Sequence, residues 1–246
     1  MKTERSRESQ SKSLAIDTND QSMLQRFNKD GFVVFRHAVE AETISLLREE
    51  VERLRMDYQF TGGLRRLTLI SPRIAEFVSS DAIHRILREL GLGDAFLVRS
   101  ILFDKTPGSN WKVAWHQDTK IPVAMRIPID GYTAWSVKEG VVHVQPPAQV
   151  LAGMRTLRLH LDDTPKENGA LRVAPGSHSN GFVNLDDIDQ FVSRECTCEC
   201  AAGDILAMSP LLLHASSPAI RATRRRVIHL EFANTPLRSP LECATA

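Results

Sequence analysis

The sequence predicts a mainly β fold with flanking α-helices, and three observations carry that prediction. Helical periodicity dominates up to about residue 93 and then gives way to short apolar segments. Gly/Pro turns separate those segments, a pattern typical of a sandwich or a small barrel. The chain has 246 residues, 42% of them apolar, which is enough to bury one sizeable core. We therefore expect a single domain over residues 20–246.

Residues 1–19 are expected to form a disordered tail, because this stretch is charged and rich in serine. It lacks the apolar centre of a secretory signal, and no apolar run in the sequence approaches the roughly 20 residues of a spanning helix. Basic and acidic residues nearly cancel, 31 against 30, so the overall charge attracts neither nucleic acid nor an anionic membrane. We expect a cytoplasmic protein with neither of these partners, and the sequence indicates no oligomeric state.

Helices are predicted at four places in the first part of the chain. They cover residues 20–30, 40–56, a segment that begins at 72, and 81–90. Ser71 can cap the third helix, and Pro72 fits its first turn. Between the helices we expect a buried strand over 32–35 and a short strand over 64–70.

Strands are expected at six places after residue 93. They cover 95–105, the surroundings of 112–119, 156–161, 170–173, 205–208 and 226–233. Asn168-Gly169 predicts a hairpin turn between two of them. The segment 120–150 contains four prolines and few clean periodicities, so we expect it to be irregular. Because it is also apolar and aromatic, it is expected to form the wall and lid of a site.

Three of the four cysteines, Cys196, Cys198 and Cys200, alternate along one predicted strand, so their thiols share a face. A thiolate metal site is one interpretation, but the Cys-x2-Cys spacing and second pair of a structural zinc site are missing. We interpret them as small apolar side chains on the inner face of a strand in a reducing compartment.

The segment Trp115-His116-Gln117-Asp118 places an imidazole and a carboxylate two residues apart. On an extended strand both side chains project to the same side, so both can reach one cation. Two histidines plus one carboxylate with open positions is the pattern of non-haem Fe(II) oxygenases. Taken alone, a His-x-Asp match is better explained as the end of a surface strand. The metal interpretation therefore requires a third ligand.

His214 lies at the end of an apolar run, Pro210–Leu213, and is the candidate third ligand, although a hydrogen-bonded core histidine has the same pattern. Eleven residues on, Arg225 and Arg226 begin a strand and point to opposite sides. A run of arginines usually marks a solvated edge, yet an inward Arg225 needs an anionic partner, such as the carboxylate of a small bound acid. The hydroxyl of Ser216 could take a remaining oxygen.

Taken together, these motifs resemble the phytanoyl-CoA dioxygenase (PhyH-like) family of Fe(II)/2-oxoglutarate-dependent oxygenases. The resemblance lies in His116-Gln117-Asp118, the distal His214 in Leu-Leu-Leu-His-Ala-Ser-Ser-Pro, and Arg225. The segments 168–178 and 30–34 are also characteristic of that family. The resemblance spans roughly residues 23–233, and its motifs are specific in this order and spacing.

The resemblance implies a double-stranded β-helix, a cupin-like jelly roll with helices outside it. It also implies that the catalytic centre is an Fe(II) ion held by His116, Asp118 and His214. The remaining residues that it implies bind the cosubstrate, 2-oxoglutarate: Arg225 pairs with the distal carboxylate, helped by Ser216, while Trp135 and Ile101 line the same pocket.

The activity implied is that of a dioxygenase that uses O2 and 2-oxoglutarate to oxidise a small molecule, with release of succinate and CO2. Relatives that halogenate replace the carboxylate ligand with a small residue, so the presence of Asp118 predicts hydroxylation, or a related desaturation or rearrangement. Two alternatives stay open: a cupin-like metalloenzyme that does not use 2-oxoglutarate, and a non-catalytic small-molecule-binding protein of the same fold. Arg225 distinguishes the oxygenase from the first alternative, because an enzyme that does not bind 2-oxoglutarate has no need of this arginine.

The residues around the motif give a weaker indication of the substrate. They mix cationic, aromatic and neutral polar types, which favours a polar or carboxylated small molecule. The candidates are Lys112, Lys120, Arg126, Arg158, Trp111, Trp115, Trp135, Tyr132, Gln117, His143, His160 and Gln145.

Overall fold

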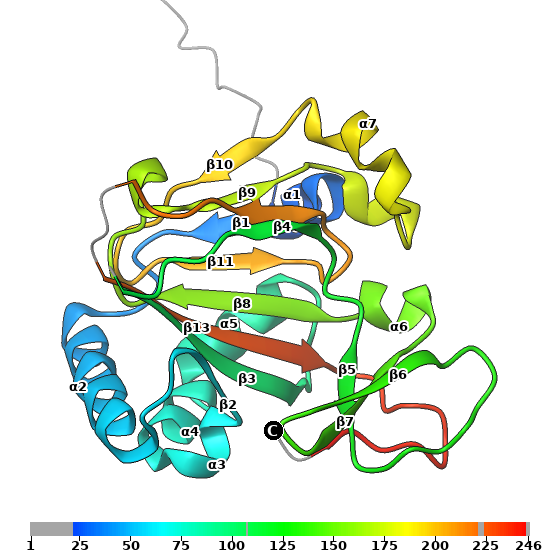
Figure 1. Cartoon of the computed structure of the whole chain (residues 1–246), viewed down its shortest axis with the longest axis horizontal. Helices are drawn as coiled ribbons and strands as arrows, with labels where there is room; N and C mark the ends of the chain where they lie inside the picture. Colours follow the sequence, from blue (N-terminus) through cyan, green and yellow to red (C-terminus); the bar gives the residue numbers. More distant parts are fainter. Residues whose placement is uncertain (1–21, 107, 221–223, 245–246) are drawn as a thin grey trace, which may run out of the picture.

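The computed structural model describes residues 22–106, 108–220 and 224–244, so the tail predicted for residues 1–19 lies outside the described part. Its largest element is a six-stranded sheet in the order β1-β11-β8-β13-β3-β2 (Figure 1). These strands are β1 (Phe32–Phe35), β11 (Ile205–Met208), β8 (Arg155–His160), β13 (Arg225–Ala233), β3 (Phe96–Lys105) and β2 (Gly62–Arg65). Each neighbouring pair of strands is antiparallel.

A four-stranded antiparallel sheet packs against the inner face of one half of the large sheet. Its order is β10-β9-β12-β4, with β10 (Cys196–Cys198), β9 (Leu171–Val173), β12 (His214–Ser216) and β4 (Val113–His116). Leu171 and Val173 of this sheet share an apolar core with Leu206 and Met208 of β11. The predicted mainly β core, a jelly roll of facing antiparallel sheets, is confirmed.

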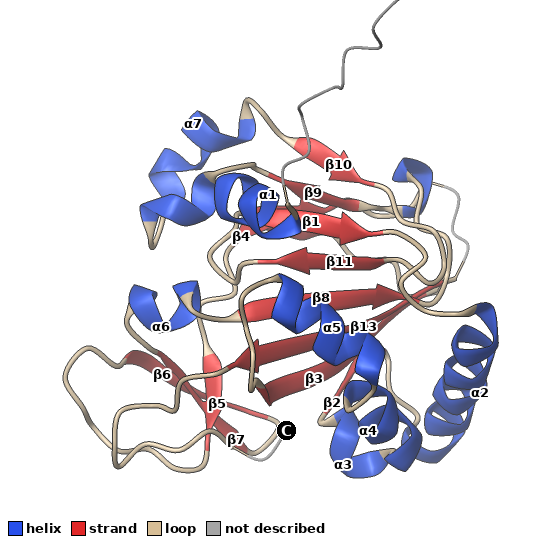
Figure 2. Cartoon of the chain, turned by 180° about the vertical axis from the view of Figure 1, so that it is seen from behind, coloured by secondary structure: helices blue, strands red, loops and turns tan. Residues whose placement is uncertain are grey.

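Helices cover the outer face of the six-stranded sheet, as Figure 2 shows from behind. They are α1 (Met23–Asp30), α2 (Ala41–Tyr58), α3 (Leu67–Ile70), α4 (Pro72–Val78) and α5 (Asp81–Glu89). The predicted cap is present, since the Ser71 hydroxyl accepts a hydrogen bond from the Ile74 backbone N–H at 3.1 Å. The stripe of α2 is buried against the sheet through Ile44, Leu47 and Leu54. None of the described helices is both long enough and apolar enough to cross a membrane.

The irregular segment predicted for 120–150 is wrong, because these residues form a third antiparallel sheet in the order β5-β7-β6. The elements are β5 (Ile121–Val123), β7 (Val141–Gln145), β6 (Thr133–Lys138) and the following helix α6 (Ala148–Ala152). Pro122 is compatible with a strand here because β5 lies at the edge of the sheet. A register shift between Thr133 and Ser136 interrupts the alternation that would have indicated β6 in the sequence.

Two further local predictions are corrected. The strand expected over 64–70 is instead β2 followed by α3, because Leu67 turns into the helical core where it is fully buried. The hairpin expected at Asn168-Gly169 is wrong, because β8 and β9 belong to different sheets and Asn168 ends a short 3-10 helix, η1 (Lys166–Asn168). The other short elements are η2 (Ser177–Asn180), η3 (Leu185–Asp187) and α7 (Ile188–Val192).

The prediction that Cys196, Cys198 and Cys200 pack as small apolar side chains is confirmed, although the strand β10 ends at Cys198. Cys198 and Cys200 are buried and Cys196 is partly buried, all in the apolar core between the two sheets. All are free thiols, as is Cys243.

Candidate active site

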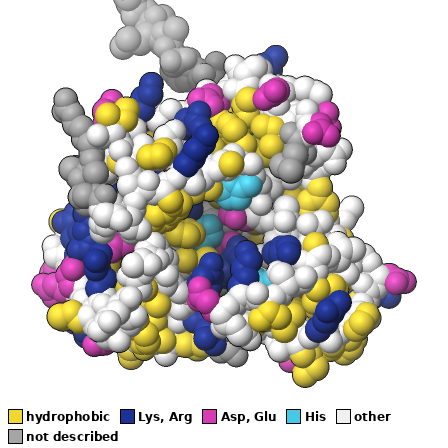
Figure 3. All heavy atoms as spheres, viewed as in Figure 1, with side chains coloured by type: hydrophobic (Ala, Val, Ile, Leu, Met, Phe, Trp, Pro, Cys, Tyr) yellow, Lys and Arg dark blue, Asp and Glu magenta, His cyan; other side chains and the backbone are white. Residues whose placement is uncertain are grey.

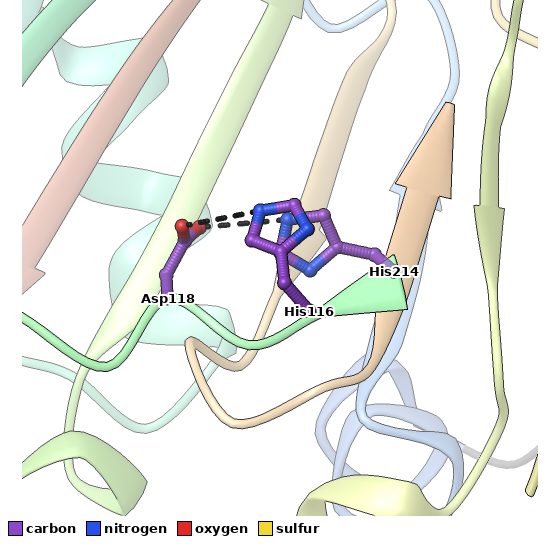
Figure 4. A group of neighbouring side chains, drawn as sticks. All are labelled: His116, Asp118 and His214. Carbon is purple, nitrogen blue, oxygen red and sulfur yellow. Dashed lines mark ion pairs between the residues drawn. The ribbon is translucent and has the colours of Figure 1, made fainter. Parts of the chain in front are cut away.

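The structure brings together His116, Asp118 and His214 at the inner side of the four-stranded sheet (Figure 4). His116 ends β4 and His214 begins β12, and the two are direct partners in the antiparallel ladder. Their ring centroids are 4.2 Å apart. The carboxylate of Asp118 lies 3.8 Å from Nε2 of His116 and 3.7 Å from Nε2 of His214. One potential ligand atom from each side chain therefore lies within 4.8 Å of the others.

Backbone carbonyls orient both imidazoles. Nδ1 of His116 lies 2.9 Å from the carbonyl oxygen of Ala114, and Nδ1 of His214 lies 2.9 Å from that of Leu212. A carbonyl oxygen accepts hydrogen bonds and cannot donate, so each Nδ1 carries the proton. Each Nε2 then presents a lone pair towards Asp118, as in histidines that ligate metals.

The protonation states suit a divalent cation. Burial disfavours the charged form of Asp118, but the electrostatic interactions with His214, His229 and Arg99 outweigh it and hold the pKa of this carboxyl well below its usual range. Burial lowers the pKa of His214 to about 4, against the opposing effect of Asp118. At neutral pH the set is an ionised carboxylate with a neutral buried imidazole. Two imidazoles and one carboxylate fit Fe(II), as well as other first-row divalent metals.

These three residues open into a cavity of about 200 Å³ between the sheets. Figure 3 shows the hollow in this face of the molecule, with histidine and basic side chains around it. The side chain of His116 is 39% exposed, whereas that of His214 is 4% exposed, so the cavity opens on the side of His116. The other lining residues are Arg65, Arg99, Ile101, Phe103, Lys105, Trp111, Val113, Lys138, Arg158, Leu171, Ser216, Arg225 and His229.

Arg225 is buried and lines this cavity, so it points inward as the alternation of the strand allowed. Its guanidinium donates to the carbonyl oxygen of Gly169, while its Nε has no hydrogen-bond partner among the described residues. The close approach depends on Gly169: it has φ 71°, and a Cβ there would lie 2.6 Å from the carbonyl oxygen of Ser217. Asn168-Gly169 thus serves this contact and not a hairpin.

Lys105 is a cation that the sequence reasoning missed. It lies opposite Arg225 in the β3–β13 ladder, and its Nζ is 3.2 Å from the Ser216 hydroxyl. Burial lowers the pKa of Lys105 to about 7, assisted by Arg225 and Arg158. Burial likewise lowers the pKa of Arg225 to about 10. The alternation of β3 could have found Lys105, because it shares the inward parity of Ile101.

A second group, Asp118, His229 and Glu231, also has ligand atoms within 4.8 Å of one another. Here both ring nitrogens of His229 already have hydrogen-bond partners. Arg158 donates to Nδ1 of His229 at 3.0 Å, so Nε2 carries the proton and donates to Glu231 at 3.0 Å. Glu231 is also paired with Arg99. The set that includes His116 and His214 is therefore the better metal site.

Of the four residues predicted for the cosubstrate, Arg225, Ser216 and Ile101 line the cavity, as the resemblance implied, and Trp135 is not among its described lining residues. Trp135 packs against a separate apolar core, with Arg126 over its ring at 5.7 Å. Of the other candidate pocket residues, Arg158 and Trp111 line the cavity.

The sequence profile described as Phytanoyl-CoA dioxygenase (PhyH) matches residues 27–227, which is most of the chain. The chain belongs to this family. Among curated relatives, it is 25% identical over 218 residues to the iron/alpha-ketoglutarate-dependent dioxygenase ausU of Aspergillus calidoustus, covering 82% of this chain and 66% of that protein. It is 24% identical over 174 residues to the ectoine dioxygenase of Stutzerimonas stutzeri (strain A1501), covering 64% of this chain and 50% of that protein. The matches thus span about half to two thirds of these relatives' lengths.

Solved structures with the same fold include two that contain bound iron. EctD from S. alaskensis with bound Fe has a TM-score of 0.69 at 17% identity, over 91% of this chain and 82% of that chain. The epimerase SnoN in complex with Fe3+, alpha ketoglutarate and nogalamycin RO has a TM-score of 0.68 at 15% identity, over 86% and 82%. At these identities the likeness shows the fold.

Proposed function

We propose that this protein is a non-haem Fe(II)/2-oxoglutarate-dependent oxygenase that oxidises a small molecule, with hydroxylation as the expected outcome. The observation that carries the proposal is the convergence of His116, Asp118 and His214 on one point of a cavity that also holds Arg225. Membership of the phytanoyl-CoA dioxygenase family and the names of the curated relatives support it.

His116, Asp118 and His214 would hold Fe(II), leaving coordination positions for the cosubstrate and for dioxygen. When bound, the iron and 2-oxoglutarate supply the activation of O2, with succinate and CO2 as by-products. The chain's own contribution is to fix the ligands. The carbonyl oxygens of Ala114 and Leu212 hold the two imidazoles in the tautomer that ligates through Nε2.

Arg225, Ser216 and Lys105 would bind the distal carboxylate of 2-oxoglutarate. The Arg225 Nε lacks a partner among the described residues, and the lowered pKa values of both basic groups reflect burial without a compensating anion. A carboxylate supplies that anion and fits the planar guanidinium. Ile101 forms the apolar wall beside it, and Trp135 is left out of the proposal because of its position on the separate core.

A cupin-like metalloenzyme that does not use 2-oxoglutarate has no need of the buried cations Arg225 and Lys105 or of the apolar wall at Ile101. We also propose that residues 20–246 form one domain and that the protein is cytoplasmic. The four free thiols, Cys196, Cys198, Cys200 and Cys243, are compatible with a reducing compartment.

The test is succinate formation from 2-oxoglutarate in air, with Fe(II) supplied and with a library of small metabolites as substrates. The variants Asp118→Ala and His214→Ala are expected to form no succinate. Asp130→Asn, at an exposed position outside the cavity, is the matched control and is expected to turn over like wild type. Undiminished succinate formation by either ligand variant would refute the assignment. Substrate oxidation that does not require 2-oxoglutarate would favour the cupin-like alternative.

A further inference from the structure

The inner face of β3 carries basic side chains at both ends. Lys105 lies beside Arg225, whereas Arg99 lies six residues back along the strand, and all of them line the cavity. Six residues of strand span about 20 Å, at roughly 3.3 Å per residue. One anion cannot reach both ends, so the cavity has two separate basic regions, with Ile101 and Phe103 between them.

The second region is formed by Arg65, Arg99 and Lys138, which we call the outer cluster. They come from three different strands, β2, β3 and β6, and converge at the edge of the cavity. All three also line a small adjoining cavity of about 30 Å³ that contains His143. The third sheet therefore contributes to the site through Lys138, although it was predicted to be irregular.

Some polar groups of the outer cluster lack a partner among the described residues. Arg65 pairs with Glu139, and Arg99 pairs with Glu231. Lys138 has no ion-pair partner among the described residues, and the buried Nε of Arg99 has no hydrogen-bond partner there. Burial lowers the pKa of Lys138, and the charges of Arg65 and Arg99 lower it further, which places the three cations within electrostatic reach of one another.

The charge balance of the whole cavity leaves this cluster uncompensated. Six basic side chains line the cavity, and Asp118 is the one carboxylate among the described lining residues. A bound Fe(II) would add two positive charges and 2-oxoglutarate two negative ones, and its distal carboxylate is assigned to the opposite end, at Arg225. The pairs with Glu139 and Glu231 leave the charge of Lys138 unpaired among the described residues, so the outer cluster keeps an excess of positive charge at the edge of the cavity.

We propose that the substrate carries an oxyanion, a carboxylate or a phosphate, that Arg65, Arg99 and Lys138 bind at the edge of the cavity. This inference rests on the proposed function, because it assigns the Arg225 end to 2-oxoglutarate and the outer cluster to the substrate. The anion would hold the substrate at the end away from Arg225, so that a C–H bond of its remaining part lies near the three proposed ligands. The cavity of about 200 Å³ also has to hold 2-oxoglutarate, so the part of the substrate that enters it is small.

The test measures anion binding by protein that is saturated with Mn(II) and 2-oxoglutarate under nitrogen. Acetate and inorganic phosphate are the probes, acetamide is the neutral control, and sodium chloride keeps the ionic strength constant. The dissociation constant is obtained from the rise of the Tm with probe concentration. The variants are Lys138→Gln and the paired Arg99→Gln/Glu231→Gln, which removes the guanidinium without leaving a lone buried carboxylate. Lys112→Gln, at an exposed position that does not line the cavity, is the matched control.

Acetate or phosphate is expected to bind wild type more tightly than acetamide does. Lys138→Gln is expected to weaken that binding about tenfold, the loss of one charge-assisted contact, while Lys112→Gln leaves it unchanged. Tighter binding of acetate indicates a carboxylate substrate, and tighter binding of phosphate indicates a phosphorylated one. The inference is overturned if neither anion binds better than acetamide, or if Lys138→Gln and Lys112→Gln bind equally.

Binding of 2-oxoglutarate is measured first in the same assay. If 2-oxoglutarate fails to bind, the proposed function is overturned and this inference with it. If 2-oxoglutarate binds and neither probe does, this inference alone is overturned. Should the paired variant not fold, Lys138→Gln decides the question, since Lys138 is exposed and replacing it disturbs no described ion pair.

Discussion

The two faces of β13 are equally buried and yet chemically opposite. Towards the helices the strand presents Ile228, Leu230 and Phe232, which belong to the main apolar core. Towards the cavity it presents Arg225 and His229, and Glu231 lies on the same side. Burial of the outer face stabilises the fold, whereas burial of charged groups costs free energy unless partners compensate it. From this difference we infer that the inner face serves binding and chemistry, whereas the outer face serves stability.

The neighbouring strand β8 repeats this division. Leu157 and Leu159 pack into the helical core, while Arg158 and His160 point the other way, into the interior of the jelly roll. If the two faces have these separate roles, substitutions on them should have separable effects on stability and on binding.

The largest effect is expected on the outer face. Leu230→Ala removes a fully buried side chain from the helical core, and such truncations cost about 2–5 kcal/mol of unfolding free energy. Urea denaturation measures the loss. The folded fraction is expected to bind metal with unchanged affinity, because Leu230 does not line the cavity. A stable Leu230→Ala protein would contradict the role assigned to this face.

Arg225→Met is expected to do the reverse. The variant should weaken the binding of 2-oxoglutarate about 100-fold, or about 2.7 kcal/mol, because the carboxylate loses its guanidinium partner. The free energy of unfolding should stay unchanged or rise, because an apolar side chain replaces a buried guanidinium. Arg226→Met is the matched control on the next residue. Arg226 pairs with Asp162 and Glu52 on the other side of the strand. Its loss should therefore lower the stability and leave the affinity for 2-oxoglutarate unchanged. Equal effects of the two variants on calorimetric binding would remove the distinction.

The inner face also makes stability depend on pH. Burial lowers the pKa of His160 to about 3, and Arg158 and Arg225 lower it further, so this imidazole is neutral in the folded state. In the unfolded chain it titrates near 6.5, hence the unfolded state binds the extra proton and stability is lost as the pH falls below about 6.5. Between pH 7 and pH 5 the contribution of His160 is about 2 kcal/mol. His160→Gln is expected to reduce the change in unfolding free energy between pH 7 and pH 5, measured by urea denaturation, by that amount. An unchanged pH dependence would contradict the role given to His160.

The smallest predicted effect concerns Lys105. Its pKa of about 7 means that the amine is charged below neutral pH, and a bound carboxylate favours the charged form. The charged groups that face it, Arg225 and Arg158, stay cationic over this range. Affinity for 2-oxoglutarate, measured calorimetrically with Mn(II), is therefore expected to fall about tenfold between pH 7 and pH 8.5. Lys105→Met should bind weakly with no such pH dependence; a variant that retains the pH dependence would assign it to another group.

The same division explains what the sequence could predict. The outer faces follow simple periodicities, so α1, β1, α2 and α5 were placed from apolar spacing alone. The convergence of His116, Asp118 and His214 was predicted from the two-residue spacing of His116 and Asp118 and from the family resemblance, which implied His214. The sequence did not predict β6, where a register shift breaks the alternation, and it gave the wrong structure for the segment 64–70 and for the turn at Asn168-Gly169.

The lining of the cavity was harder to predict because it depends on which strands face one another. Lys105 lies within a strand that was predicted correctly, yet only the β3–β13 register places it beside Arg225. Lys138 and Arg65 belong to different sheets, and no local pattern indicates that they meet. Trp135 shows the converse error, since the resemblance implied a place beside the cosubstrate and the side chain packs on a separate apolar core.

The most direct test of the central claim is the iron content of each protein after equilibrium dialysis against Fe(II) under nitrogen. The geometry predicts one iron per wild-type chain and essentially none for His116→Ala, Asp118→Ala or His214→Ala, while His229→Gln retains the metal. Full iron occupancy in the His214→Ala variant would contradict the account, because it would mean that the imidazole and carboxylate groups of Figure 4 do not hold one ion together.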